Sequence, residues 1–102
     1  MMIYRVDISP AAKEELIIYV EGGIEFGEDI PEKILNAFDK VIDMLEENPY
    51  SGVSDLPYLP AKYRASHLWK HYWLIYQIYE KEQCVKIDYV IDDRQNYIRF
   101  IH

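Results

Sequence analysis

The second half of the chain contains two stretches in which apolar and polar positions alternate, residues 72–79 and residues 85–92. A period of two is typical of a β-strand that buries one face. Because only a short polar segment separates the two stretches, we predict an antiparallel hairpin, with residues 62–68 as an earlier strand of the same sheet. The predicted apolar faces are Tyr72, Leu74, Tyr76 and Ile78 in the first strand of the hairpin and Val85, Ile87, Tyr89 and Ile91 in the second.

The first half of the chain begins with a strand pattern and continues with a helical one. Residues 3–8 alternate in the same way and predict a short strand. Ser9 then suits the N-cap of a helix and Pro10 suits its first position. We therefore predict a helix that runs from there to about residues 26–27.

A second helix is predicted directly after the first. Asp29 and Glu32 have the spacing of a capping box, and Asn48-Pro49 ends the pattern. Residues 50–60 contain a glycine and two prolines and predict a loop. Apolar residues recur every three to four positions, as expected of a helix that faces a core, at Ile34, Phe38, Val41, Ile42 and Leu45.

The order of these elements, β-α-α-β-β-β, predicts an α+β fold. Two N-terminal helices would pack on one face of a small, mainly antiparallel sheet. The chain has 102 residues, which suits one domain with a single core, and we predict that this domain spans residues 1–102.

Charge is distributed unevenly along the chain, although the net charge is -7. Residues 14–55 carry twelve acids against Lys33 and Lys40, a balance of -10. Residues 56–79 carry no acid and have a balance of +3, to which their histidines add charge at lower pH. The negative net charge argues against binding of nucleic acid over the whole protein surface. The basic segment is still a candidate for contacting an anion.

Two arginines are the first candidates for that contact. Arg64 lies within the predicted strand of residues 62–68, and Arg94 follows the last predicted strand. We expect their guanidinium groups to converge on one exposed patch. An arginine suits a phosphate there, since it can bind the phosphate through two hydrogen bonds. Each arginine can instead be a solvated strand residue or an ion-pair partner of a helix acid. Tyr97, close to Arg94, completes the predicted catalytic set.

The basic segment also supplies the predicted substrate-binding or partner-binding residues, which are Lys62, His67, Lys70, His71 and Trp73. The two histidines are four residues apart, which on a strand separates their side chains by about 13 Å, so we predict no metal site. The tryptophan has two interpretations, stacking on a nucleic-acid base or packing in a core. No cofactor is expected.

Cysteine usage and hydropathy bear on the compartment. Cys84 is the single cysteine, which excludes an internal disulfide and agrees with a reducing environment. No segment of the sequence has the pattern of a signal peptide or of a membrane-spanning helix. We therefore expect a cytoplasmic protein that does not enter a membrane.

Taken together, these motifs resemble the RelE/ParE toxins of bacterial type II toxin-antitoxin modules, over almost the whole chain. The resemblance implies the α+β fold above, growth inhibition, and a cognate antitoxin that covers the active face. RelE-like members cut messenger RNA in the ribosomal A site without a metal, whereas ParE-like members poison DNA gyrase. The segments that carry the resemblance are Ser9-Pro10-Ala11-Ala12, Pro49-Tyr50-Ser51-Gly52, Tyr63-Arg64, Tyr72-Trp73-Leu74-Ile75-Tyr76 and Val90-Ile91-Asp92-Asp93-Arg94-Gln95-Asn96-Tyr97.

The chain departs from the RelE pattern at two positions. Arg64 falls where RelE-like members keep a basic residue, but Ser66 stands in place of a second lysine and Trp73 in place of a catalytic arginine. Missing cations weaken the nuclease interpretation, because RNA cleavage needs positive charge around the phosphate. Acid-base chemistry would have to come from His67, His71, Tyr97 or His102. The resemblance leaves three possibilities: nuclease, gyrase poison, or a non-toxic module that only binds antitoxin.

Overall fold

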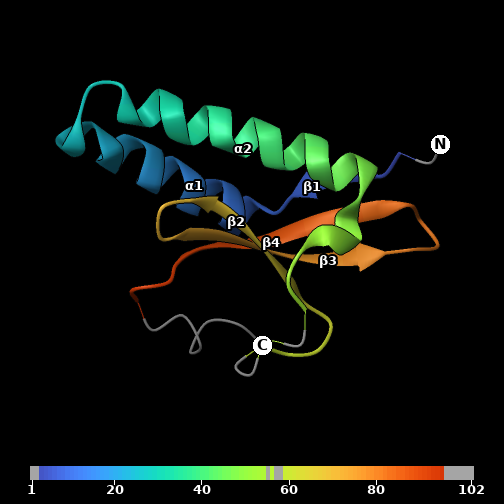
Figure 1. Ribbon diagram of the computed structural model, residues 1–102. Helices are drawn as coiled ribbons and strands as arrows, with labels where there is room; N and C mark the ends of the chain where they lie inside the picture. The colour runs from blue at the N-terminus through green and yellow to red at the C-terminus, as the bar shows by residue number, and fades with distance from the viewer. Residues whose placement is uncertain (1–2, 55, 57–58, 96–102) are drawn as a thin grey trace.

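Two helices cover one face of a four-stranded sheet in the computed structural model, which describes residues 3–54, 56 and 59–95 (Figure 1). The predicted α+β fold is confirmed, with the helices before three of the four strands. A 3-10 turn, η1, extends the first helix, and a second turn, η2, follows the other. The bounds are β1 Arg5–Ile8, α1 Pro10–Gly22, η1 Gly23–Phe26, α2 Ile30–Glu47, η2 Pro49–Ser51, β2 Arg64–Trp69, β3 Tyr72–Tyr79 and β4 Cys84–Asp92.

The sheet has the order β1-β4-β3-β2. β1 runs parallel to β4, and the other two pairs are antiparallel, as the predicted hairpin requires. Along β3, Tyr72 pairs with Asp92 at one end, whereas Tyr76 pairs with Arg64 towards the other. This register decides which candidate residues can meet.

The faces of β4 differ from the predicted alternation. Val85 and Ile87 join the helix-side core, but Tyr89 and Ile91 pack on the opposite face of the sheet. The β3–β4 register shifts where Asp88 is left without a directly paired residue, so the prediction that all four apolar residues share a face is wrong. One extra residue in a bulge reverses the direction of every side chain beyond it.

The two helices begin differently. The Ser9 hydroxyl accepts a hydrogen bond from the Ala12 amide at 3.0 Å, as predicted for the N-cap of α1. The predicted capping box of α2 is wrong, because Asp29 has helical backbone angles and makes no side-chain cap. Its carboxylate instead pairs with Lys33 at 2.9 Å. A capping side chain needs the extended backbone conformation that Ser9 has.

Apolar side chains fill both faces of the sheet, and burial of this surface is the main stabilising contribution to the fold. The helix-side core is built around Leu16, Ile34, Leu45, Leu74, Tyr76, Val85 and Ile87. A smaller cluster lies on the opposite face, around Leu59, Tyr63, Ala65, Ile75 and Ile91. None of the helices in the described ranges is long and apolar enough to span a membrane.

Candidate functional site

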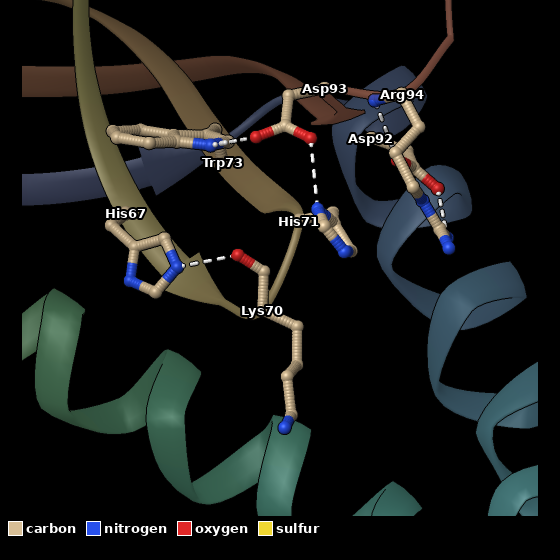
Figure 2. A network of polar contacts seen from close by, with 7 residues as sticks. All are labelled: His67, Lys70, His71, Trp73, Asp92, Asp93 and Arg94. Carbon is tan, nitrogen blue, oxygen red and sulfur yellow. Dashed lines mark hydrogen bonds and ion pairs between the residues drawn. The ribbon is translucent and has the colours of Figure 1, made fainter.

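Most of the predicted binding residues gather around the turn between β2 and β3. Figure 2 shows His67, Lys70, His71 and Trp73 there, together with Arg94. Two acids that the sequence alone does not single out contact these residues: Asp93 contacts Trp73 and His71, and Asp92 contacts Arg94. Tyr97 and His102 are outside the described residues. Lys62 lies away from the turn, with its ammonium 5.1 Å from the centre of the Tyr63 ring.

The turn itself has an unusual backbone. Lys70 and His71 connect the two strands, and Lys70 has a φ of 52°, in the left-handed region. Tight hairpin turns need this conformation, which glycine and asparagine adopt more readily than lysine. The Lys70 carbonyl lies 2.7 Å from Nε2 of His67. The His67 side chain thus satisfies a backbone group of the turn.

Asp93 ties two predicted binding residues to the end of β4. Its carboxylate accepts a hydrogen bond from the Trp73 indole at 3.0 Å and lies 3.2 Å from Nδ1 of His71. The Asp93 amide donates to the His71 carbonyl at 2.8 Å. The His67 ring packs edge-on against Trp73, with 5.1 Å between ring centres. Trp73 is therefore held on the sheet face opposite the helices.

Asp92 holds Arg94 through both of its carboxylate oxygens. The guanidinium donates through Nε at 3.0 Å and through Nη2 at 2.7 Å. Asp92 is only 5% exposed, and the hydrogen bonds from Arg94 lower its pKa in spite of the opposing effect of burial. The same ion pair raises the pKa of Arg94. The positive charge of Arg94 is thus balanced within the protein.

A cleft of about 480 Å³ opens beside this turn, between the helices and the sheet. Tyr72 in its wall stacks on Tyr19 of α1, with ring centres 4.4 Å apart, and Lys70 lies 5.5 Å from the centre of the Trp69 ring. Phe26 is 79% exposed at its rim. The cleft is lined by Phe26, Ile30, Lys33, Trp69, Lys70, His71, Tyr72 and Arg94.

Arg64 belongs to a different cluster, at the loop that follows α2. Its Nη1 donates to the carbonyls of Tyr50 and Gly52, both at 3.2 Å, and its guanidinium lies 5.1 Å from the centre of the Tyr50 ring. The buried Tyr76 hydroxyl donates to the Pro49 carbonyl at 2.6 Å. We call Arg64 and Tyr76, with the loop of residues 49–53 that they hold, the clamp.

The clamp is extended by Glu80. Its carboxylate accepts hydrogen bonds from the hydroxyls of Tyr4, at 2.8 and 3.0 Å, and of Tyr50. These bonds lower the pKa of Glu80 and, with burial, raise the pKa of Tyr4 to about 12. No sequence signal pointed to this contact, because it joins side chains that are 76 positions apart.

The structure separates Arg64 from Arg94. Arg64, in β2, pairs with Tyr76 of β3. Arg94 is bound to Asp92 of β4, the strand on the other side of β3, and Asp92 pairs with Tyr72. Four residues along a strand correspond to about 13 Å. The expected patch in which the two guanidinium groups converge is therefore not formed. Of the two arginines, only Arg94 lines the cleft.

The two positions that depart from the RelE pattern are both packed into the protein. Ser66 is buried in β2, with 6% of its surface exposed. Trp73 packs against the apolar cluster on the sheet face opposite the helices and donates to Asp93.

The two helices packed on a four-stranded mixed sheet match the RelE/ParE fold. The family model described as "ParE toxin of type II toxin-antitoxin system, parDE" matches residues 6–97. The chain therefore belongs to the ParE toxin family of type II toxin-antitoxin systems, and a cognate antitoxin is its implied partner. No curated protein sequence gave a match.

Proposed function

We propose that residues 1–102 form the growth-inhibiting toxin of a toxin-antitoxin module and act in the cytoplasm on DNA gyrase without cutting messenger RNA. Membership of the ParE toxin family supports the toxin role. The choice of gyrase over messenger RNA depends on the partners of the cationic side chains.

Those partners are the observation that carries the proposal. Arg94 is bound to Asp92, His71 lies beside Asp93, and Arg64 donates to backbone carbonyls. Metal-free RNA cleavage needs several donors gathered around one phosphate, where negative charge grows in the transition state. Within the described part of the chain, Arg64 is separated from the other two, and all three groups already have partners in the protein, so they do not form such a centre.

Overall charge supports a protein target in the same way. The chain carries a net charge of -7. Binding to ribosomal RNA is dominated by neutralisation of phosphates, which an acidic protein opposes. A protein surface can be recognised through apolar contact and a few local charges.

Induced expression of the chain without its antitoxin tests this function. We expect growth to stop and the DNA damage response to be induced, because a poisoned gyrase leaves broken DNA. Primer extension should show intact messenger RNA. Cuts within translated messages would instead assign the chain to the nucleases, and normal growth at high soluble expression would favour the non-toxic module, which the buried Ser66 and the packed Trp73 also permit.

The catalytic roles of Arg64, Arg94 and Tyr97 stay predictions, and a matched pair of variants tests the first of them. Arg64→Ala removes two hydrogen bonds of the clamp and Tyr76→Phe removes one, but only Arg64→Ala removes a cation. A loss of growth arrest confined to Arg64→Ala would assign Arg64 a contact with the target. An equal loss in both variants would assign the effect to folding.

A further inference from the structure

We propose that the outer side of α1 and η1 is the surface that docks on DNA gyrase, against a region of gyrase that is both basic and apolar. The proposal rests on the proposed function, because that function supplies gyrase as the partner. It adds the place where the chain contacts its target and the chemistry of that contact. We call this surface the isoleucine face, and it consists of Ile17, Ile18 and Ile24 with Glu14, Glu21 and Glu25.

The first helix carries apolar side chains on both of its sides. Ala12 and Leu16 are buried in the helix-side core. Ile17 and Ile18 follow directly in the chain, yet they are 44% and 63% exposed, and Ile24 is 60% exposed. A helix that only covers a sheet has a polar outer side. Large apolar side chains gathered on an exposed helix side are typical of a surface that a partner covers.

The three isoleucines share one side of the helix. Ile17 and Ile18 are neighbours in the chain, and Ile24 follows Ile17 by seven positions, which is about two helical turns. α1 packs against α2 along one side and against β4 on another (Figure 1). The exposure of the isoleucines places them on the side that neither element covers. None of the six residues of the isoleucine face lines the cleft, so docking here is separate from any binding there.

Acids surround these isoleucines. Glu14 and Glu21 each lie about one helical turn from the first two isoleucines, and Glu25 directly follows the third. All three glutamates are exposed, and within residues 3–54, 56 and 59–95 none of them pairs with a base. Residues 10–26 carry four acids against Lys13, a balance of -3. The isoleucine face is therefore apolar at its centre and negative at its edge.

This charge pattern decides between possible partners. A second copy of the chain in a two-fold contact would bring the same unpaired glutamates together, and like charges repel. Nucleic acid and anionic lipid are both negative and are repelled in the same way. A basic polypeptide surface with exposed apolar side chains is complementary to both parts of the isoleucine face.

Gyrase meets this requirement by its chemistry. An enzyme that binds DNA neutralises phosphates with lysine and arginine side chains, so it carries basic surface. A protein interface has an apolar core and a polar rim, and opposite charges at the rim speed up association. The isoleucines supply such a core and the glutamates such a rim.

Two isoleucines give this proposal a matched pair of variants. Ile18 lies in the isoleucine face, whereas Ile3 precedes β1, and each is 63% exposed. Surface plasmon resonance would measure binding of the full chain to purified gyrase. Ile18→Glu should weaken this binding about tenfold or more, because it puts a carboxylate in the apolar centre of the contact. Ile3→Glu should bind like the wild type, and both variants should keep the wild-type melting temperature, since the replaced side chains are exposed.

Variants at Glu21 test the charged edge. Glu21→Lys should weaken gyrase binding about fivefold, because it replaces attraction with repulsion. The binding of Glu21→Lys should also depend less on salt than that of the wild type, since salt screens exposed charges. The matched control is Glu82→Lys, an equal change of charge in the exposed turn between β3 and β4, which should bind like the wild type.

Three results would overturn the proposal. They are wild-type gyrase binding by Ile18→Glu, an equal loss of binding in Ile18→Glu and Ile3→Glu, and no binding of the wild-type chain to gyrase. If Ile18→Glu binds gyrase normally but loses a dimer seen in sedimentation, or loses its antitoxin, the face belongs to that partner instead.

The docking site and the proposed function can fail separately. A chain that breaks plasmid DNA in the presence of gyrase, and does so equally well as Ile18→Glu, would keep its function and lose this docking site. A chain whose gyrase binding depends on Ile18 but that leaves plasmid DNA intact would keep the docking site and lose the function.

Discussion

The clamp and the cleft lie at different ends of β3, and their polar groups are used in different ways. At the clamp, Arg64, Tyr76 and Glu80 are bonded to groups of the protein itself. At the cleft, Lys70 has an aromatic neighbour but no carboxylate in the described structure, and Phe26 is exposed. A basic residue in a toxin fold is therefore not by itself a target contact, and its partners distinguish a structural role from an available one.

The largest expected effect comes from breaking the clamp at Gly52. A Cβ atom there would lie 2.1 Å from the Tyr76 hydroxyl and 2.8 Å from the Ala65 carbonyl oxygen. Tyr76 is fully buried and cannot move aside, so Gly52→Ala should lower the free energy of unfolding by about 3 kcal/mol. Chemical denaturation measures this change.

Gly22→Ala is the matched control for that variant. Gly22 has helical backbone angles and no atom within 4 Å of the added Cβ. The Gly22→Ala substitution should raise the free energy of unfolding by about 0.5–1 kcal/mol. Equal effects of the two substitutions would contradict the close packing of the loop on Tyr76.

Removing single hydrogen bonds from the clamp should have a smaller effect. Tyr76→Phe leaves the Pro49 carbonyl without its donor, and Arg64→Ala removes the donor to Tyr50 and Gly52. Each variant should lower the free energy of unfolding by about 1–2 kcal/mol in urea denaturation. A wild-type stability for Arg64→Ala would show that Arg64 is not part of the clamp.

Acid should weaken both ends of β3. The pKa of Asp92 is lowered by Arg94, and that of Glu80 by the hydroxyls of Tyr50 and Tyr4. A lowered pKa in the folded state means that these groups stabilise the protein above their unfolded values of about 3.9 and 4.3, and that the stabilisation is lost as pH falls through the folded values. The pKa of Glu15, raised by burial, acts in the opposite direction.

Denaturation midpoints measured from pH 7 down to pH 3 would follow this loss. Asp92→Asn and Glu80→Gln should each flatten the curve below about pH 4.5, since the substituted side chain no longer takes up a proton. Asp39→Asn, on the exposed surface of α2, is the control. A curve that keeps its full slope in the Asp92→Asn variant would contradict the pairing with Arg94.

The smallest effect compares the two hairpin turns. Lys70 and Gln83 both have a positive φ, 52° and 50°. Lys70→Gly relieves the strain and should raise the free energy of unfolding by up to about 1 kcal/mol. Gln83→Gly should gain less or lose stability, because its side chain donates to Glu80. Thermal unfolding of the two variants side by side would reveal the difference.

The sequence predicted the elements well because local rules determine them. The N-cap at Ser9 and the alternation in residues 72–79 need only neighbours along the chain. The bulge at Asp88 was not predicted, because an extra residue leaves the alternation of apolar and polar positions intact along the sequence. It changes only the face of the sheet to which the later side chains point. The capping box at Asp29 failed because a motif does not fix the backbone angles that it requires.

The candidate site was predicted less well, because it depends on register. The sequence predicts Lys70, His71 and Trp73 as binding residues, and the structure places them at or beside the turn between β2 and β3, while their binding role stays a prediction. Asp92 and Arg94 are two positions apart at the end of a predicted strand. Their ion pair could therefore be predicted from the sequence. The separation of Arg64 from Arg94 required the strand pairing itself.

Purified gyrase tests the central claim most directly. Supercoiled plasmid would be incubated with gyrase, ATP and the chain, and the DNA would be analysed after denaturation of the protein. We predict that broken, linear plasmid accumulates with the amount of chain added and is absent when gyrase is omitted. Unbroken plasmid at every concentration, together with cleavage of messenger RNA on programmed ribosomes by the same preparation, would contradict the account.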